Sequence, residues 1–326
     1  MNKQFIVIAL IITIGGVSCV WAKTQNVWPQ YQNVATKAQP IAFYGGMISS
    51  SGSYKLAVPL SGAGPLITIA ASGVTLDLNG EELEITTSTD NCITIAMTAP
   101  YSNITIKNGF LQGNGGGSGI GIVAGGNQLI GVQIYDIWAT GFNNGIDLTS
   151  ADPVDDVVIY NSSLRNNLIA GLELGATVGV WVQNCEACFN LGFGFITSGG
   201  ATGVTISNCV AKFNSNTGFD VSVAGGTGII ENCISQENNA GGIGFGFNTA
   251  ALINPGPNAI SPWDFVNNIA KNNGNNPANN TTTLALTDTN YAIDGDATIV
   301  SFPSNRQPYY QTLRAVPSAQ GNITLP

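Results

Sequence analysis

The most constraining feature of this sequence is a repeat with a period of 23 to 24 residues that runs from Tyr135 to Asn248. Each copy carries an asparagine, which we call the anchor, followed six positions later by a second asparagine and ten positions later by a glycine. The anchors are Asn161, Asn184, Asn208 and Asn232, the second asparagines are Asn167, Asn190, Asn214 and Asn238, and the glycines are Gly171, Gly194, Gly218 and Gly242. A repeat of this length is typical of proteins built by stacking one small unit many times.

Short strands are expected within each repeat. The five residues that end at an anchor have period two, which is clearest where apolar and polar residues alternate, as in residues 104–108 and 204–208. A second short apolar segment follows each glycine, as in residues 194–197, and Gly-rich turns separate the segments. Alternation with period two indicates strands. Strands repeated at this period without helices predict a solenoid, in which equivalent strands of successive coils lie side by side.

Positions that recur in every repeat form columns along such a solenoid. The alternation places two apolar columns inside: Val157, Val180 and Val204, and then Ile159, Val182 and Ile206. Small side chains three residues after each anchor are expected at a tight corner, and the next column is expected outside: Thr140, Arg165, Cys188, Lys212 and Gln236. Both asparagine columns are expected to be structural, because amides at turns can bond their own backbone and the next coil in a ladder.

Further anchors extend the solenoid beyond the four clearest repeats. Eight anchors stand at positions 79, 108, 136, 161, 184, 208, 232 and 267, with an aspartate at 136. An irregular insertion with three prolines covers residues 248–263. The sequence thus predicts one elongated all-β domain over residues 67–275, with about eight or more coils of 23 to 29 residues. A cap region at residues 23–66 and a tail at residues 276–326 are expected to flank it.

Residues 1–22 predict a secretory signal. Lys3 precedes an apolar run at residues 5–14 that is too short to span a bilayer as an ordinary helix, and cleavage after Ala22 fits the small-residue rule. We therefore expect a secreted, periplasmic or cell-surface protein. An alternative is lipidation at Cys19, and membrane attachment is expected only in that case.

Composition excludes several partners and chemistries. The chain has no histidine, which removes imidazole bases, Ser-His triads and histidine-ligated zinc. Its net charge of −9 becomes −10 once Lys3 leaves with the signal, so no nucleic-acid partner is expected. Loss of Cys19 leaves five of the six cysteines. Those that directly follow an anchor are expected to be free, buried thiols stacked one per coil: Cys185, Cys209 and Cys233.

Residues 67–275 resemble the right-handed parallel β-helix proteins of the pectin-lyase-like class. Residues 74–80, Val-Thr-Leu-Asp-Leu-Asn-Gly, are similar to a first coil of that class, and the Asn-Cys repeats are similar to its later coils. The resemblance implies a single-domain right-handed parallel β-helix. The class includes lyases, hydrolases, epimerases, adhesins and phage-tail proteins, so the resemblance implies a fold and leaves the activity open. The Gly-His-Gly element of its pectin hydrolases is absent from a chain without histidine.

Three aromatic residues form the first candidate site. Tyr135 and Tyr160 occupy the same outward position in successive coils, and Trp181 is diagonal to them in the next coil. Flat rings pack against the apolar faces of sugars while neighbouring amides bond the hydroxyls, and proteins of the resembled class often bind long glycans along such a sheet. These three residues are therefore predicted to bind polysaccharide. The alternative is that a terminal tail covers the rings, or that they simply suit a strand.

An acidic turn immediately before Val157 forms the second candidate site. Asp152, Asp155 and Asp156 are predicted to hold Ca²⁺ or to act as acid and base, with Arg165 or a tyrosine taking a proton. In a lyase the cation would neutralise the carboxylate of an acidic sugar, whereas a hydrolase would need two carboxyl groups at a defined separation. The alternative is an ordinary exposed turn, because Asp and Pro are common turn residues.

These observations favour an exported β-helix protein that binds polysaccharide or a cell-surface glycan along one face of the solenoid. Two alternatives stay open. The first is a carbohydrate-active enzyme, either a metal-assisted polysaccharide lyase or a glycoside hydrolase, for which Ca²⁺ is a candidate cofactor. The second is a non-catalytic structural or adhesive surface protein.

Overall fold

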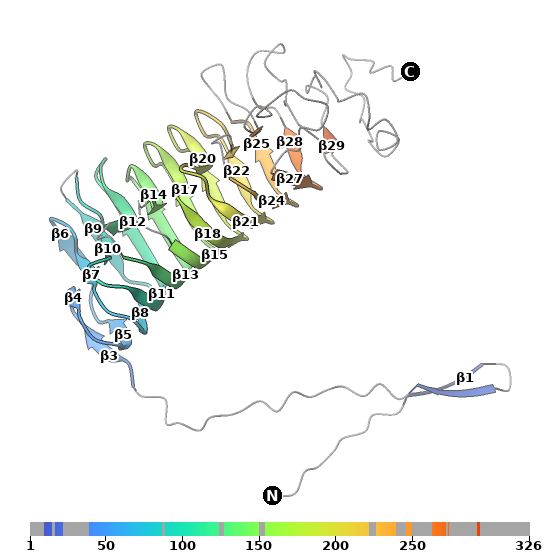
Figure 1. The fold of residues 1–326 in the computed structure, drawn as a ribbon, viewed down its shortest axis with the longest axis horizontal. Coiled ribbons are helices and arrows are strands. Elements are labelled where there is room, and N and C mark those ends of the chain that lie inside the picture. Colours follow the sequence, from blue (N-terminus) through green and yellow to red (C-terminus); the bar gives the residue numbers. More distant parts are fainter. Residues whose placement is uncertain are drawn as a thin grey trace, which may run out of the picture. The chain divides into compact units, whose positions relative to one another are not determined.

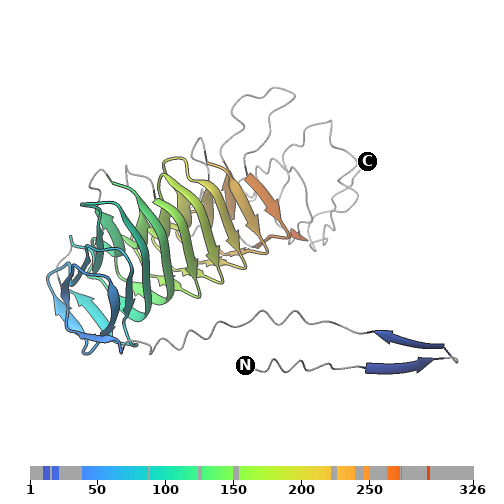
Figure 2. The same ribbon diagram turned by 60° about the horizontal axis from the view of Figure 1, so that its bottom comes forward.

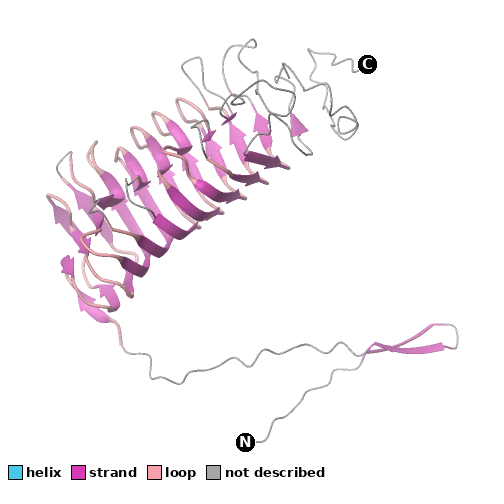
Figure 3. Cartoon of the chain, in the orientation of Figure 1, coloured by secondary structure: helices cyan, strands magenta, loops and turns pink. Residues whose placement is uncertain are grey.

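The computed structural model describes residues 10–14, 17–21, 39–86, 89–123, 127–149, 154–221, 226–238, 246–249, 263–271, 273 and 292–293. The chain divides into two compact units, Met1–Gln39 and Pro40–Pro326. Strands are the regular elements of this described part, which contains no helix (Figure 3). Accordingly, no helix long and apolar enough to cross a membrane occurs in those ranges. The prediction of an all-β chain is confirmed.

The described residues of the first unit form an antiparallel hairpin. Its strands are β1 (Leu10–Ile14) and β2 (Val17–Trp21). Leu10 pairs with Trp21 at one end of the register, and Ile14 pairs with Val17 at the other. Both strands lie within residues 1–22, whose role as an export signal stays a prediction.

The second unit is a solenoid of short parallel strands, in which each strand pairs with its equivalents in the coils before and after it (Figure 1). One of its sheets has nine strands in the order β26, β23, β20, β17, β14, β12, β10, β7, β4. Their bounds are β4 (Gly46–Ile48), β7 (Ile67–Ile69), β10 (Ile93–Ala96), β12 (Ser118–Val123), β14 (Asn144–Leu148), β17 (Ala170–Leu174), β20 (Phe193–Thr197), β23 (Phe219–Val221) and β26 (Phe247–Thr249).

The other strands of the solenoid form two parallel ladders. The first ladder contains β3 (Ile41–Phe43), β5 (Gly52–Leu56), β8 (Val74–Asp77), β11 (Tyr101–Gln112), β13 (Leu129–Thr140), β15 (Val154–Tyr160), β18 (Thr177–Gln183), β21 (Thr202–Ser207), β24 (Gly228–Glu231) and β27 (Trp263–Val266). The second contains β6 (Leu60–Gly62), β9 (Glu82–Ile85), β16 (Ser163–Arg165), β19 (Glu186–Cys188), β22 (Val210–Lys212), β25 (Ile234–Gln236), β28 (Ile269–Lys271) and β29 (Ala292–Ile293). The long strands β11 and β13 belong to both ladders.

The order of strands repeats in every coil. From β5 onward, a strand of the first ladder is followed by one of the second ladder and then by one of the nine-stranded sheet, as in β15, β16 and β17, and β11 and β13 each serve both ladders. Before β5, strand β3 is followed directly by β4 of the nine-stranded sheet. Successive coils stack in sequence order along this unit, as a second view also shows (Figure 2). The second unit is a right-handed parallel β-helix: the repeat predicted a solenoid, and the resemblance predicted this particular kind.

The anchors bend the chain between the two ladders. All eight anchors have a left-handed backbone, with φ between 51° and 60°. Asparagine, aspartate and glycine tolerate this conformation best, which explains why Asp136 substitutes for asparagine without breaking the column. The anchors are exposed, and the amides of Asn184 and Asn161 are 3.5 Å apart. The bend, rather than an amide ladder, accounts for this column.

The predicted amide ladder is formed by the second asparagines. In each step the backbone N–H and the side-chain Nδ2 of one asparagine donate to the Oδ1 of the next, as between Asn167 and Asn190 at 3.0 and 3.1 Å. The same Nδ2 atoms reach backbone carbonyls of the preceding coil, as in Asn190 to Leu164 at 3.3 Å. The ladder consists of Asn167, Asn190, Asn214, Asn238 and Asn273, all buried. The ladder supplies hydrogen-bond partners to backbone N–H and C=O groups of turns that water does not reach.

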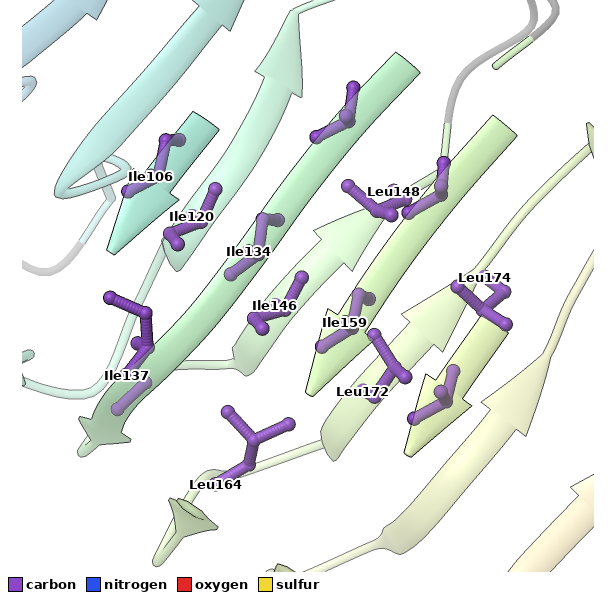
Figure 4. Packing of buried hydrophobic residues seen from close by; sticks show 14 of the residues in the cluster. Ile106, Ile120, Ile134, Ile137, Ile146, Leu148, Ile159, Leu164, Leu172 and Leu174 are labelled. Atoms are coloured by element: carbon purple, nitrogen blue, oxygen red, sulfur yellow. The ribbon is translucent and has the colours of Figure 1, made fainter. Parts of the chain in front are cut away.

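The core is a set of apolar columns that run the length of the solenoid. The two columns predicted to face inward are fully buried, with 0 to 1% of each side chain exposed. Figure 4 shows Ile106, Ile134 and Ile159, which pair in register in successive coils of the first ladder. On the nine-stranded sheet, the rings of Phe195 and Phe219 stack with centroids 4.9 Å apart. Equivalent positions in successive coils therefore carry similar side chains, and these side chains pack against one another.

The cysteines after the anchors are free and buried, as predicted. The backbone N–H of Cys185 donates to Sγ of Cys209, and that of Cys209 to Sγ of Cys233, both at 3.4 Å. The prediction that Cys188 faces solvent is wrong, because only 2% of this residue is exposed. Cys188 is covered where its strand lies between those of Arg165 and Lys212.

Strand pairing continues at both ends of the solenoid. Strands β3 to β6, within the predicted cap region, pair with the first coils of the solenoid. Beyond the predicted insertion, β27 and β28 continue the ladders, and the anchor Asn267 keeps its left-handed φ of 51°. Residues 250–262 and most of the predicted tail lie outside the described residues.

Candidate functional site

The two predicted tyrosines form a stacked pair on the outside of the first ladder. Tyr135 on β13 pairs in register with Tyr160 on β15, so their side chains leave the sheet at neighbouring points. Their ring centroids are 4.5 Å apart and the ring planes differ by 11°. Both residues are half-buried. The parallel ladder thus holds two rings in a face-to-face stack without any loop.

Trp181 stands on the next coil of the same surface. It precedes Gln183 by two residues, and Gln183 pairs with Tyr160, so Trp181 lies on the outward face one position nearer the start of the strand. Residues two apart on a strand are separated by about 7 Å. Trp181 is 62% exposed, compared with 42% for Trp138 and 1% for Trp263. We call the surface carrying Tyr135, Tyr160 and Trp181 the aromatic face.

A lysine borders the aromatic face on the side of the earlier coils. Lys107 pairs in register with Tyr135, and its Nζ lies 5.9 Å from the centre of that ring. The same Nζ is 3.5 Å from Oδ2 of Asp77. Burial alone would lower the pKa of Lys107, but Asp77 and Tyr135 outweigh it and the pKa is raised. Lys107 is therefore a protonated cation that already has a carboxylate partner.

The environment of Tyr160 keeps its hydroxyl protonated. Burial is the largest cause that raises the pKa of Tyr160, and the neighbouring Tyr135 and the Asp136 carboxylate raise it further. A raised pKa makes Tyr160 a poor base at neutral pH, because almost none of it is phenolate. This favours a binding role over proton abstraction for this tyrosine.

The predicted acidic turn is described in part. Asp155 lies near the start of β15 and accepts a hydrogen bond from Nε2 of Gln128 at 2.6 Å, while its Oδ1 is buried without a hydrogen-bond partner. Five residues separate it from Tyr160, which corresponds to about 17 Å along a strand. Asp152 lies outside the described residues.

Asp156 occupies a bend that glycines occupy in the neighbouring coils. Its φ is 55°, and the residues at the same point before and after it are Gly131 and Gly179, with φ of 71° and 67°. Its Oδ1 lies over the backbone of Gly179, only 3.3 Å from where a Cβ would be. The left-handed bend is a sufficient reason for an aspartate at this position.

Arg165 is held on the second ladder, beyond the bend at Asn161. It forms an ion pair with Glu186, donates from Nε to the hydroxyl of Ser163 at 2.8 Å and lies 5.1 Å from the ring centre of Trp138. Among the described contacts, none joins Arg165 to Asp155 or to the aromatic face. Burial would raise the pKa of Glu186, but hydrogen bonds from Arg165 and Cys188 and nearby positive charge hold it below its usual value.

A pair of carboxylates on the nine-stranded sheet escaped the sequence reasoning. Asp147 on β14 pairs in register with Glu173 on β17. Nδ2 of Asn144 donates to both carboxylates, at 3.1 and 2.8 Å, so the two acceptor oxygens lie within about 6 Å of each other. Asn144 is 5% exposed, and its Oδ1 has no hydrogen-bond partner. The available signal was positional, since each acid stands two residues after a glycine: Glu173 follows the repeat glycine Gly171, and Asp147 follows Gly145, which stands nine residues after the anchor Asp136.

Two further aromatic pairs also escaped the sequence reasoning. Phe110 and Trp138 on the second ladder have ring centroids 5.8 Å apart. Phe189 and Phe213 are stacked at 4.9 Å on left-handed backbone, and both are exposed. Equal spacing from consecutive anchors was the signal for each pair. In the described ranges, no three His, Cys, Asp or Glu side chains meet as a potential metal site, and the Ca²⁺ prediction stays a prediction.

Comparisons with known proteins address the fold. No protein family and none of the curated proteins matches this chain. Among solved structures, the chain is similar to the pectate lyase Pel9A, with 15% identity, 73% of this chain and 70% of that chain covered, and a TM-score of 0.45. It is also similar to the A-module of the mannuronan C-5 epimerase AlgE4 of Azotobacter vinelandii, with 15% identity, 78% and 81% covered, and a TM-score of 0.42. Neither likeness assigns an activity or a residue role to this chain.

Proposed function

We propose that this protein is exported and binds polysaccharide along the aromatic face of its solenoid. The observation that carries the proposal is the stacked pair of Tyr135 and Tyr160, with the exposed Trp181 on the next coil. Export rests on the signal-like pattern of residues 1–22. A glycan that crosses several coils would meet one side chain per strand spacing of about 4.8 Å.

The surroundings of the rings suit the hydroxyl groups of a sugar. Neighbouring outward positions of the first ladder carry amides and hydroxyls: Thr105, Gln133, Gln183 and Thr205. These groups donate and accept hydrogen bonds, while the rings offer flat apolar surface. Trp181 leaves most of its surface in water, and its packing inside the protein gives no reason for so large a side chain there. A ligand that covers the ring supplies such a reason.

A carbohydrate-active enzyme is the second candidate, and the pair of Asp147 and Glu173 favours it. The two oxygens that Asn144 binds are no more than about 6 Å apart, which is compatible with the roughly 5–5.5 Å between the acid and the nucleophile of a retaining glycoside hydrolase and shorter than the separation in an inverting one. The shared amide of Asn144 holds both groups in place. This candidate uses the nine-stranded sheet, so its test is independent of the aromatic face.

Affinity electrophoresis tests the binding function. The mature chain is run through gels that contain one member of a panel of neutral and acidic polysaccharides, and retardation measures binding. Trp181→Ala should lose the retardation by the polysaccharide that the unaltered protein binds. Trp138→Ala is the matched control, since it removes an exposed tryptophan from the second ladder. Equal mobility of the unaltered protein in every gel would reject the proposal and leave a structural or adhesive rod.

The enzyme candidate needs a product assay on the same panel. Reducing ends without ultraviolet-absorbing product would indicate a hydrolase, and absorbance of unsaturated product would indicate a lyase. Glu173→Gln should remove a hydrolase activity and leave gel retardation unchanged. Absence of both signals, with and without added Ca²⁺, would reject the enzyme candidate.

A further inference from the structure

We infer that the polysaccharide held on the aromatic face is neutral, an inference that rests on the binding function proposed above. It follows from the charges that the structure gathers around Tyr135, Tyr160 and Trp181. A face for a uronate or sulfated glycan needs positive groups free to meet the anions. The aromatic face offers none in its described surroundings and is bordered by carboxylates.

Lys107 is the one cation among the described outward residues of β8, β11, β13, β15, β18 and β21 in the first ladder. Its Nζ is 3.5 Å from Oδ2 of Asp77, and 28% and 26% of the two side chains are exposed. The pair contributes no net charge to the face. An anionic sugar that approached Lys107 would compete with Asp77 for the same cation and would be repelled by that carboxylate.

Three carboxylates on the same ladder give the surroundings of the aromatic face a net negative charge. Asp136 follows Tyr135 directly and acts on the hydroxyl of Tyr160. Asp155 and Asp156 are the second and third residues of β15, and Asp155 pairs with Val178, three residues before Trp181. Three residues of strand correspond to about 10 Å. The ion pairs of the described residues are Lys107–Asp77 and Arg165–Glu186, so none neutralises these three aspartates.

Electrostatic repulsion from these carboxylates is strong enough to disfavour binding of polyanions to the aromatic face. At an ionic strength of about 0.1 M the screening length is about 10 Å. Asp136 directly follows Tyr135 and lies within this length, and the offset of Asp155 from Trp181 along the strand is comparable with it. A polyanion places a charge on many sugars in succession, so its repulsion from three carboxylates adds up along the face. The net charge of −9 on the chain acts in the same direction. A neutral glycan meets the same rings and amides without this cost.

The experiment compares one glycan with its charged derivative. The neutral polysaccharide that retards the protein most strongly is oxidised at its primary alcohols, which converts those groups to carboxylates on the same backbone. We expect the dissociation constant to rise at least about tenfold at low salt, and most of the difference to vanish at high salt, where screening is strong. Tighter binding to the oxidised derivative, or retardation by acidic panel members alone, would overturn the inference while the binding function stands. If no panel member retards the protein, the proposed binding function and this inference are both rejected.

A charge-neutral variant separates electrostatics from a steric effect of oxidation. The triple variant Asp136→Asn, Asp155→Asn, Asp156→Asn keeps side-chain size, and asparagine suits the left-handed backbone at positions 136 and 156. It should bind the neutral glycan as before and bind the oxidised derivative almost as well. Glu82→Gln removes an exposed carboxylate from the second ladder and should leave the discrimination unchanged. A triple variant that still rejects the oxidised glycan would overturn the electrostatic origin and with it the inference.

Discussion

Asn190 binds Asn214 twice, because its backbone N–H and its side-chain Nδ2 donate to the same Oδ1, at 3.0 and 2.8 Å. Nδ2 of Asn214 in turn donates to the carbonyl of Ala187 at 3.0 Å. Both asparagines are fully buried. One amide per coil thus satisfies the polar groups of a turn that water does not reach.

Replacement of a ladder asparagine should be costly. Asn214→Ala leaves the N–H of Asn190 and the carbonyl of Ala187 without their partner, and we expect the free energy of unfolding to fall by about 3 kcal/mol. The matched control is Asn208→Gly, which alters an exposed anchor at φ 53° that glycine tolerates. It should change stability by less than about 0.5 kcal/mol. Urea unfolding measures both, and equal losses would contradict the assignment of the two columns.

A methyl group on the repeat glycine Gly171 of β17 should also destabilise the solenoid. A Cβ on Gly171 would lie 2.8 Å from the Cβ of Ala187 and 2.8 Å from the carbonyl oxygen of Gly194. Gly171→Ala should therefore lower the free energy of unfolding by about 2 kcal/mol, because neighbouring backbone has to move. At Gly62 the nearest atom is a Leu66 methyl at 3.7 Å, and Gly62→Ala should be close to neutral. Thermal unfolding of the two variants compares the sites directly.

The pair of Arg165 and Glu186 should make stability fall in acid. The folded state holds the pKa of Glu186 below its usual value. Its contribution is therefore present above the ordinary carboxyl pKa of about 4.3 and is lost as the pH falls through the lower folded pKa. Both side chains are about a third exposed, so we expect about 1 kcal/mol or less. Glu186→Gln should flatten the stability curve between neutral pH and pH 3, measured by urea unfolding; an unchanged slope would contradict this.

The buried thiols should resist modification in the folded protein. Burial raises the pKa of Cys188 to about 12 and also raises that of Cys209, so little thiolate exists at pH 8. A chromogenic aromatic disulfide should react with these cysteines slowly in buffer and fast in concentrated urea. Cys188→Ser removes the thiol that sequence reasoning placed in solvent and should leave the slow native rate unchanged. Fast reaction of the native chain would mean that the columns open readily.

The repeat predicts the parts of this fold that depend on register alone. Val157, Val180 and Val204 are inside because alternation within a strand and pairing between coils fix their side, whatever their neighbours. The anchors are likewise recoverable, even where Asp136 replaces asparagine. The prediction that Cys188 faces solvent was wrong because alternation within a strand does not encode the neighbours in adjacent coils. Cys188 pairs in register between Arg165 and Lys212, and it is buried there.

The candidate sites show a similar limit. The stack of Tyr135 and Tyr160 is readable from their equal positions in successive coils. Asp155 and Asp156 attracted attention because they are contiguous in sequence, yet left-handed backbone accounts for Asp156. Asp147 and Glu173 are far apart in sequence and become neighbours only through pairing of β14 with β17. Clusters of this kind emerge once each coil is aligned at its glycine as well as at its anchor.

The asparagine ladder also bears on how such a chain can change its length. Each ladder amide contacts only the coil before and the coil after it, so no coil depends on its absolute position. A tandem duplication of the 24 residues from Cys185 to Asn208 would bring its own anchor, ladder amide and glycine, and would join both neighbours in frame. Gene-level gain or loss of whole units can therefore lengthen or shorten the rod without new packing, and with it the reach of the surface it carries.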